Sequence, residues 1–214
     1  MNTLEFPASI QQDLEKMQLA VSDQQQALWR SYITLLARWN KNFNLTAITD
    51  PLQMVYRHLY DSLSIAAYIQ GDKVVDVGAG AGLPGIPLAI LMPKKEFTLL
   101  DSNGKKTRFM QQAVLELGLT NCRVVKSRVE QFNPEDHYDH VVCRAFAELD
   151  KITKLCQHLL LPTGSILAMK SSKAEYEVSQ LTQKQTRNIK ITPLKVIGIS
   201  EPRCLVEINN ENKA

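Results

Sequence analysis

From residue 73 onward, the chain alternates strand-like runs with helix-like runs, and this alternation constrains the fold more than any other feature. The strand-like runs are rich in β-branched residues, the helix-like runs have one apolar face, and Gly, Pro or Asn separates many of them. Strands joined by helical crossovers form a mostly parallel sheet with helices on both faces. The predicted strands are 73–77, 96–100, 122–126, 138–143 and 165–169, and the predicted helices are 86–92, 105–117 and 149–160.

The two ends of the chain depart from this alternation. The first seventy residues indicate helices, with a capping box at Ser22 and Gln25 and later helical segments at 52–58 and 59–69. Near the other end, strand-like runs at 189–199 and 205–208 are joined by a short turn containing Pro202, which is typical of an antiparallel hairpin. We therefore predict a helical extension at residues 1–70, packed on an α/β domain at residues 71–214 with a seven-stranded sheet.

Composition excludes several classes of protein. The 214 residues are 44% hydrophobic and 22% charged, which is typical of a folded globular protein. Pro or polar residues interrupt the apolar stretches before they reach the roughly 18 residues that span a bilayer. The first ten residues contain Glu5 and Pro7 and lack a basic segment, which argues against a secretory signal. The expected location is the cytoplasm, without a membrane contact.

Cysteines and charges add weaker constraints. Cys122, Cys143, Cys156 and Cys204 follow no metal-binding spacing, so buried free thiols are favoured over a disulfide or a zinc site, and no metal is expected. The net charge of +3 is unevenly distributed, because residues 61–150 hold ten cations and twelve anions whereas residues 151–214 hold ten and five. This C-terminal excess permits a polyanionic partner without identifying one.

A glycine-rich segment at residues 78–85 lies between the first predicted strand and the helix that follows it. Gly80, Gly82 and Gly85 match the pattern Gly-x-Gly-x-x-Gly. Glycines let a ligand approach the main chain closely, and the amides at the start of the helix then face that ligand. The alternative is a tight strand-to-helix turn that binds nothing.

Two acidic residues indicate what the glycine-rich segment binds. Asp101 ends the second predicted strand, where a carboxylate in this kind of fold accepts hydrogen bonds from a ribose, so the ligand is a nucleoside. A nicotinamide dinucleotide and S-adenosylmethionine (SAM) are the competing cofactors. Asp76, directly before the glycines, would repel a pyrophosphate but suits the ammonium and sulfonium groups of SAM. The C-terminal hairpin and the short chain, which has little room for a second mononucleotide-binding half, also favour SAM.

Five blocks of sequence resemble one known family. They lie at residues 57–63, 78–90, 100–106, 127–130 and 144–147, and they are similar to the signature blocks of the RsmG (GidB) family of bacterial 16S rRNA guanine-N7 methyltransferases. The resemblance implies a SAM-dependent methyltransferase (Rossmann-like) fold and a target guanine in the 530 loop of 16S rRNA, in naked rRNA or in the small ribosomal subunit. Cys143 stands where the family often has Ser. The cofactor contacts that the resemblance and the glycine motif imply are Gly78, Gly80, Leu83, Asp101, Val129, Glu130 and Arg144.

Methylation of guanine N7 needs no catalytic base, because this nitrogen carries a lone pair and no proton. The expected site residues position the reactants, which can supply about 7 to 11 kcal/mol of the barrier. We predict that Arg144 lies beside the methionine end of the cofactor or the target guanine; a surface salt bridge is the alternative. His58 and Asp61 lie three residues apart on one helix face, where they can couple or can simply fix the helix against the sheet.

Basic residues near the predicted site suggest where RNA binds. Lys105, Lys106 and Arg108 crowd the first turn of a helix, where cations oppose the helix dipole unless anions such as RNA phosphates lie nearby. A solvated face explains these three residues equally well. Lys170 can extend this basic surface, although a solvated surface charge is the favoured interpretation of that residue. A non-catalytic RNA-binding or ribosome-assembly factor that retains the methyltransferase fold is the alternative function.

Overall fold

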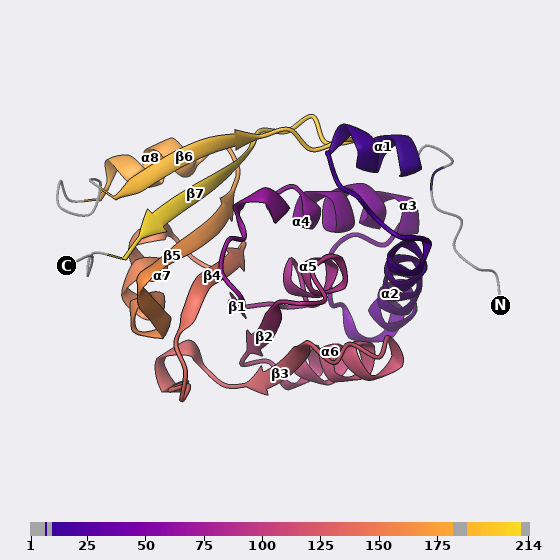
Figure 1. The fold of residues 1–214 in the computed structure, drawn as a ribbon, viewed down its shortest axis with the longest axis horizontal. Coiled ribbons are helices and arrows are strands. Elements are labelled where there is room, and N and C mark those ends of the chain that lie inside the picture. The colour runs from indigo at the N-terminus through magenta and orange to yellow at the C-terminus, as the bar shows by residue number, and fades with distance from the viewer. Residues whose placement is uncertain (1–6, 8–9, 182–187, 211–214) are drawn as a thin grey trace.

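A twisted seven-stranded sheet runs through the middle of the molecule (Figure 1). The computed structural model describes residues 7, 10–181 and 188–210. Across the sheet the strand order is β3-β2-β1-β4-β5-β7-β6. The strands are β1 (Lys73–Val77), β2 (Glu96–Asp101), β3 (Cys122–Lys126), β4 (Tyr138–Arg144), β5 (Leu160–Lys170), β6 (Ile189–Leu194) and β7 (Arg203–Asn209).

Five strands are parallel and the last two are antiparallel, as the sequence predicts. Val74 of β1 lies opposite Phe97 of β2 on one side and His140 of β4 on the other. β7 inserts between β5 and β6 and runs antiparallel to both. The carboxyl ends of the five parallel strands therefore meet at one edge of the sheet, where ligands bind in open α/β folds.

Helices cover both faces of the sheet (Figure 1). Because strand side chains alternate between faces, Val74 and Val142 pack against the N-terminal helices, α5 and α6, whereas Val75 and Val141 pack against α7. The helices outside the N-terminal part are α5 (Gly85–Leu91), α6 (Gly104–Glu116), α7 (Leu149–Cys156) and α8 (Ala174–Ser179), with 3-10 turns at Val129–Gln131 and Gln157–Leu159.

The N-terminal helices form one continuous core with the sheet. Ser22 begins α2 with the predicted capping box, because its hydroxyl accepts from the Gln25 amide and the Gln25 side chain accepts from the Ser22 amide. Trp29 and Tyr32 of α2 are fully buried. The N-terminal elements are α1 (Ile10–Lys16), α2 (Asp23–Phe43), α3 (Pro51–Met54), a π-helical turn (Val55–Tyr60), α4 (Asp61–Leu63) and a 3-10 turn (Ala66–Tyr68).

Several predicted elements differ from the observed ones. The predicted helix at 149–160 ends earlier, because β5 begins at Leu160 and contains the Pro-Thr-Gly segment beside an irregularity in its pairing with β4. The predicted strand at 189–199 ends at Leu194, and the chain then turns at Gly198, which has a φ of +77°. The regular helices predicted at 52–69 contain the π-helical turn, and α8 is absent from the prediction.

The cysteines lie as the sequence predicts. Cys122, Cys143 and Cys156 are buried, Cys204 is partly exposed, and all four are free thiols. Burial raises the pKa of Cys122 and of Cys156 to about 12, so these thiols are protonated at neutral pH. Within the described residues, no helix is both long enough and apolar enough to cross a membrane.

Candidate functional site

The glycine-rich loop between β1 and α5 adopts a backbone shape that other residues rarely take. Gly78, Gly80 and Gly82 have φ values of +71°, +60° and +81°. At Gly80, a Cβ atom would make only ordinary van der Waals contacts, since the nearest atoms, the Gly78 carbonyl oxygen and Lys106 Nζ, are 3.8 Å away, so the glycine is required by its torsion and not by crowding. The loop therefore presents bare backbone to the carboxyl edge of the sheet.

Asp76 lies beneath this loop. Its side chain is fully buried, and one carboxylate oxygen accepts a hydrogen bond of 2.8 Å from the Gly85 amide at the start of α5. The other oxygen has no hydrogen-bond partner. Burial raises the pKa of Asp76 to about 7, although the Gly85 hydrogen bond and the Arg144 charge oppose this shift. The expectation of a carboxylate at the ligand surface is thus wrong: Asp76 lines neither of the two pockets beside the loop.

Asp101 connects the end of β2 with the glycine loop. One of its carboxylate oxygens accepts from the Gly80 amide at 2.9 Å, and the other accepts from the Asn103 amide at 2.8 Å. Asn103 in turn caps α6, because its side chain accepts from the Lys105 amide. Asp101 also lines a pocket, so the carboxylate that orders the loop lies where the sequence predicts the ribose.

Two pockets meet at the glycine loop. The smaller has a volume of about 300 Å³, and the larger has a volume of about 650 Å³. Gly78, Lys106 and Ala145 line both pockets, so the two pockets adjoin, and together they are called the cleft. Of the predicted cofactor residues, Gly78, Asp101, Val129 and Glu130 line the smaller pocket, and Gly78, Gly80, Leu83 and Arg144 line the larger.

Arg144, at the end of β4, forms part of a charged cluster in the wall of the larger pocket. Its Nη1 donates to the Arg57 carbonyl and to Asp61 Oδ2, both at 3.0 Å. Arg203, at the start of β7, places its Nε 3.4 Å from the other oxygen of Asp61. Arg144 therefore makes an ion pair with a buried carboxylate and also lines the larger pocket, and its place beside the cofactor or the guanine stays a prediction.

His58 lies beside this cluster on the π-helical turn. Its Nε2 lies 2.8 Å from the Thr46 hydroxyl, and its Nδ1 lies 3.0 Å from the Arg57 carbonyl. Burial, together with the Arg144 charge, lowers the pKa of His58 to about 4. The imidazole is therefore neutral at pH 7, and it fixes the Thr46 loop, which lines the larger pocket.

The predicted RNA-contacting residues occupy different environments. Lys106 is half-buried and lines both pockets, whereas Lys105 and Arg108 are exposed on α6 outside them. Lys170 lines the larger pocket, but its ammonium donates to the Ala147 carbonyl at 2.6 Å and to Glu177 at 2.7 Å. The Lys170 charge is thus largely satisfied within the protein.

Comparison with known proteins identifies the family. A family model described as GidB, rRNA small subunit methyltransferase G, matches residues 24–204. The chain belongs to this family. A Hydrogenovibrio crunogenus protein named ribosomal RNA small subunit methyltransferase G is 46% identical over 203 residues, which cover 95% of this chain and 94% of the relative. A Psychromonas ingrahamii protein of the same name is 43% identical, over 94% of this chain and 96% of the relative.

A solved structure supports the fold assignment. A SAM-dependent methyltransferase from Aquifex aeolicus superposes with a TM-score of 0.59 at 19% identity, covering 81% of this chain and 97% of that one. Together with the strand order, this likeness confirms the predicted methyltransferase fold.

The structure also reveals residues that the family blocks alone do not place in the cleft. Arg203 and Lys173 belong to no predicted block, yet both line the larger pocket. Among the described lining residues of this pocket, six cations face two acids, which gives the cleft of this GidB-family protein an excess of positive charge. The cations are Arg57, Lys106, Arg144, Lys170, Lys173 and Arg203, and the acids are Asp61 and Glu177.

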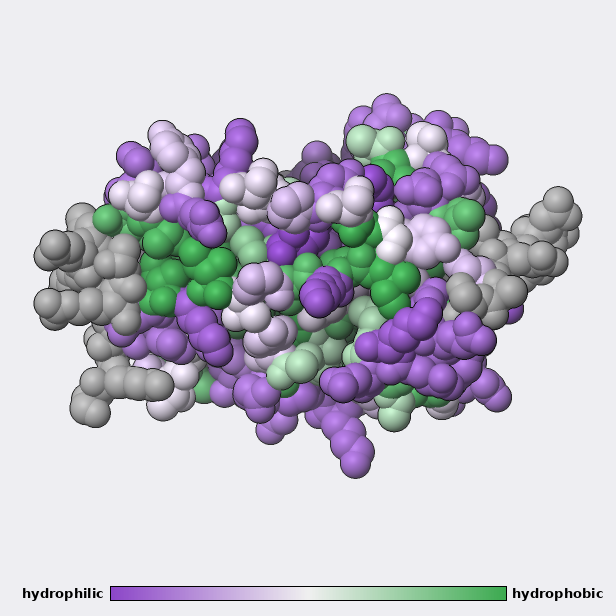
Figure 2. Space-filling view, turned by 90° about the horizontal axis from the view of Figure 1, so that it is seen from above, coloured by the Kyte–Doolittle hydropathy of each residue, from purple (hydrophilic) through white to green (hydrophobic). Residues whose placement is uncertain are grey.

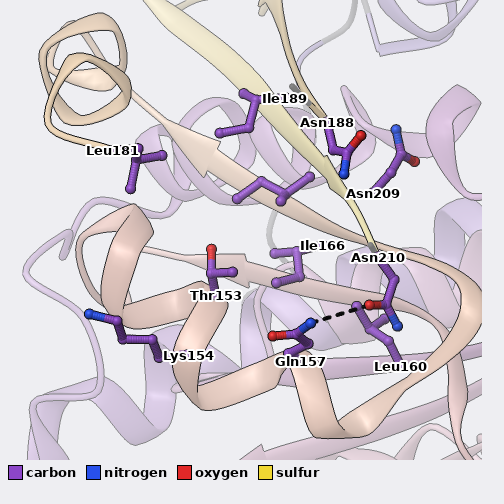
Figure 3. Close-up of a pocket in the computed structure, with 11 residues that line it drawn as sticks. Thr153, Lys154, Gln157, Leu160, Ile166, Leu181, Asn188, Ile189, Asn209 and Asn210 are labelled. Atoms are coloured by element: carbon purple, nitrogen blue, oxygen red, sulfur yellow. Dashed lines mark hydrogen bonds between the residues drawn. The ribbon is translucent and has the colours of Figure 1, made fainter. Parts of the chain in front are cut away.

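A separate pocket of about 230 Å³ lies between α7 and the C-terminal strands (Figure 3). Gln157 and Asn210 lie side by side at its edge, where Gln157 Nε2 donates to Asn210 Oδ1 at 3.5 Å. None of the predicted site residues line this pocket.

Figure 2 shows apolar side chains gathered on the same end of the molecule, and polar side chains over much of the remaining face. In the described part of the chain, no cluster of His, Cys, Asp and Glu is suited to a metal ion.

Proposed function

We propose that this GidB-family protein transfers a methyl group from SAM to N7 of a guanine in small-subunit rRNA. The observation that carries the proposal is the divided cleft at the glycine loop, with Asp101 in one part and Arg144 in the other. The names of the relatives support rRNA as the substrate. The 530 loop of 16S rRNA, and the cytoplasm where that rRNA is found, follow from the resemblance of the five sequence blocks.

The residues of the cleft fit the two halves of SAM. In this proposal the smaller pocket takes the adenosine, with the ribose at Asp101 and the base near Val129 and Glu130. The methionine half then follows the bare backbone at Gly80 into the larger pocket. The buried Asp76 lies under this path; its pKa of about 7 leaves it partly ionised at neutral pH, and the ionised form favours a cationic ligand over a pyrophosphate. The antiparallel hairpin, in place of a second mononucleotide-binding half, argues further against a dinucleotide.

The chemistry requires placement of the reactants and no proton transfer. SAM supplies an electrophilic methyl group on a sulfonium, and guanine N7 offers a lone pair. The protein must hold the guanine in line with that methyl group and accept charge that moves from the sulfur to the base. His58 is neutral and hydrogen-bonded to Thr46, and Arg144 is held by Asp61, so both form a fixed wall of the larger pocket. Arg144 remains protonated throughout and orients a ligand without acting as a base.

Transfer of tritium from labelled SAM to purified small-subunit rRNA tests the proposal. We expect labelling of a single guanine, located by the chain cleavage that borohydride and aniline produce at N7-methylguanine. Gly80→Val should abolish SAM binding in calorimetry while the circular dichroism spectrum persists, because valine strains the loop torsion whereas its Cβ atom makes no close contact with the rest of the fold.

Two results would contradict the proposal. Retention of rRNA without labelling would identify a non-catalytic RNA-binding or ribosome-assembly factor. Binding of NADH in place of SAM would identify a dehydrogenase.

A further inference from the structure

Asp61 stands at the meeting point of three segments that are distant in the sequence. It follows the π-helical turn, and its carboxylate contacts Arg144 at the end of β4 and Arg203 at the start of β7. The Asp61 side chain is 5% exposed, whereas Arg144 and Arg203 are 20% and 23% exposed. The carboxylate is therefore sealed into the wall, and both guanidinium groups reach the larger pocket.

One carboxylate does not balance two guanidinium groups. Arginine has five N–H donors in a fixed fork and does not lose its charge. Arg144 Nη1 is bound to Asp61 and the Arg57 carbonyl, and Arg203 Nη1 donates to the Pro202 carbonyl. Arg203 Nε lies 3.4 Å from the second oxygen of Asp61, which has no hydrogen-bond partner, so this pairing is purely electrostatic. The pair thus keeps one excess positive charge and spare donors at the pocket surface.

We propose that Asp61 is a positioning residue that holds Arg144 and Arg203 together as an oxyanion-binding site in the wall of the larger pocket. Without Asp61, the two cations repel each other and have no common anchor. With it, both guanidinium groups are held on one carboxylate in the wall of the same pocket, an arrangement that suits a carboxylate or a phosphate. This inference rests on the proposed function, which supplies two such groups: the carboxylate of the methionine half of SAM, and a phosphate of the rRNA.

The neighbouring contacts favour a fixed site over a mobile one. The Arg57 carbonyl receives Arg144, and the Arg57 side chain makes an ion pair of 2.7 Å with Glu201, two residues before Arg203. Both arginines of the site are thus tied to the same helical turn. The anion would meet donors that are already oriented, which reduces the entropy lost on binding.

Calorimetry on Asp61→Asn distinguishes the two sources of the oxyanion. Asparagine keeps the shape and one acceptor but removes the charge. S-adenosylhomocysteine carries the amino-acid carboxylate, whereas 5′-methylthioadenosine contains the same adenosine and thioether without it. If the site takes that carboxylate, Asp61→Asn weakens S-adenosylhomocysteine binding by about tenfold and leaves methylthioadenosine binding unchanged. If the site takes a phosphate, the affinity for a hairpin RNA with an unpaired guanine falls instead, and the salt dependence of log K decreases by about 0.7.

Two further variants provide a second test of the same site and a control. Arg203→Gln removes one guanidinium, retains the pairing of Asp61 with Arg144, and should weaken the same ligand as Asp61→Asn. Asp136→Asn is the matched control, because it breaks the exposed ion pair of 2.6 Å with Lys73 far from the cleft, and it should change neither affinity.

Three outcomes would overturn the inference. The first is that Asp61→Asn leaves the affinities for S-adenosylhomocysteine and for the hairpin RNA unchanged, and the second is that it lowers the affinity for methylthioadenosine as much as that for S-adenosylhomocysteine. The third is that the wild-type protein binds neither S-adenosylhomocysteine nor the RNA. Wild-type protein that binds S-adenosylhomocysteine but labels no rRNA would contradict the proposed function while the comparison of variants still decides the role of Asp61.

Discussion

At the scale of single residues, the site uses carboxylates to shape its backbone. Asp101 accepts from the Gly80 amide, and Asp76 accepts from the Gly85 amide, so two acids hold the two ends of the glycine loop. They differ in their access to solvent and to the cleft. Asp101 lines the smaller pocket, whereas Asp76 is sealed beneath the loop with one oxygen unpaired.

The buried carboxyl group of Asp76 predicts a dependence of stability on pH. Its pKa is raised from 3.8 to about 7, so between these values the folded protein keeps a proton that the unfolded chain has lost. The contribution of Asp76 to the free energy of unfolding should therefore decrease as pH rises from about 4 to about 7, by roughly 1.4 kcal/mol per pH unit. Asp76→Asn removes the ionisable carboxyl group but keeps an acceptor for the Gly85 amide.

Urea unfolding of both proteins across this pH range measures the effect. The stability of the wild type relative to Asp76→Asn should fall with rising pH, because contributions from other groups, including His58, cancel in the difference. A difference that stays constant with pH would contradict the assigned environment of Asp76.

At the scale of secondary-structure elements, α2, which belongs to the N-terminal part of the chain, stabilises the glycine loop through a hydrogen bond. The Tyr32 hydroxyl donates to the Ala81 carbonyl at 2.6 Å, and Ala81 lines the larger pocket. Tyr32 is fully buried, and burial raises its pKa far above the usual range, so it remains a donor at all relevant pH values. Trp29 on the same helix donates to the Pro87 carbonyl at 3.1 Å in α5, which is outside the cleft.

Tyr32→Phe should lower both stability and cofactor affinity. The change leaves a buried carbonyl unpaired, which costs about 1–3 kcal/mol, and it frees the loop that lines the cleft. Thermal unfolding and calorimetry with S-adenosylhomocysteine measure the two effects. Trp29→Phe is the comparison on the same helix, and it should lower stability without a comparable loss of affinity. Equal losses of affinity in both variants would show that Tyr32 has only a general structural role.

Sequence reasoning identified the elements that local patterns specify and missed those that tertiary contacts specify. The strands from Lys73 to Met169 have clear apolar runs between turn residues, so their existence and their alternation with helices along the chain follow from the sequence. The apolar residues after Leu194 predict a strand, whereas in the structure Val196 and its apolar neighbours pack on the core from a loop. Arg203 was not identified as a site residue, because only the fold brings it to Asp61.

At the scale of the whole molecule, the position of the charges matters more than the net charge of +3. The cations of the larger pocket come from the N-terminal helices, α6, the end of β4 and the C-terminal region, so the fold concentrates charge that the sequence spreads out. Lys106 lies where the two pockets meet, and Lys105 lies beside it on the exposed face of α6. A cleft that concentrates positive potential attracts a polyanion.

Lys106→Ala should weaken RNA binding and reduce the salt dependence of log K by about 0.7, the effect of losing one phosphate contact with a single strand. Titrations of a fluorescent hairpin RNA at several salt concentrations measure both quantities. The control is Lys94→Ala, an exposed lysine near the start of β2 at the opposite edge of the sheet, which should change neither. An unchanged slope for Lys106→Ala would remove this residue from the RNA interface.

A crystal structure with S-adenosylhomocysteine tests whether the two pockets at the glycine loop form one cofactor cleft. We expect the ribose at Asp101, the adenine beside Val129 and the amino-acid end in the pocket that Arg144 lines. Electron density for the ligand in the separate pocket between α7 and the C-terminal strands, or at any other place outside the cleft, would show that the cofactor does not bind at the glycine loop.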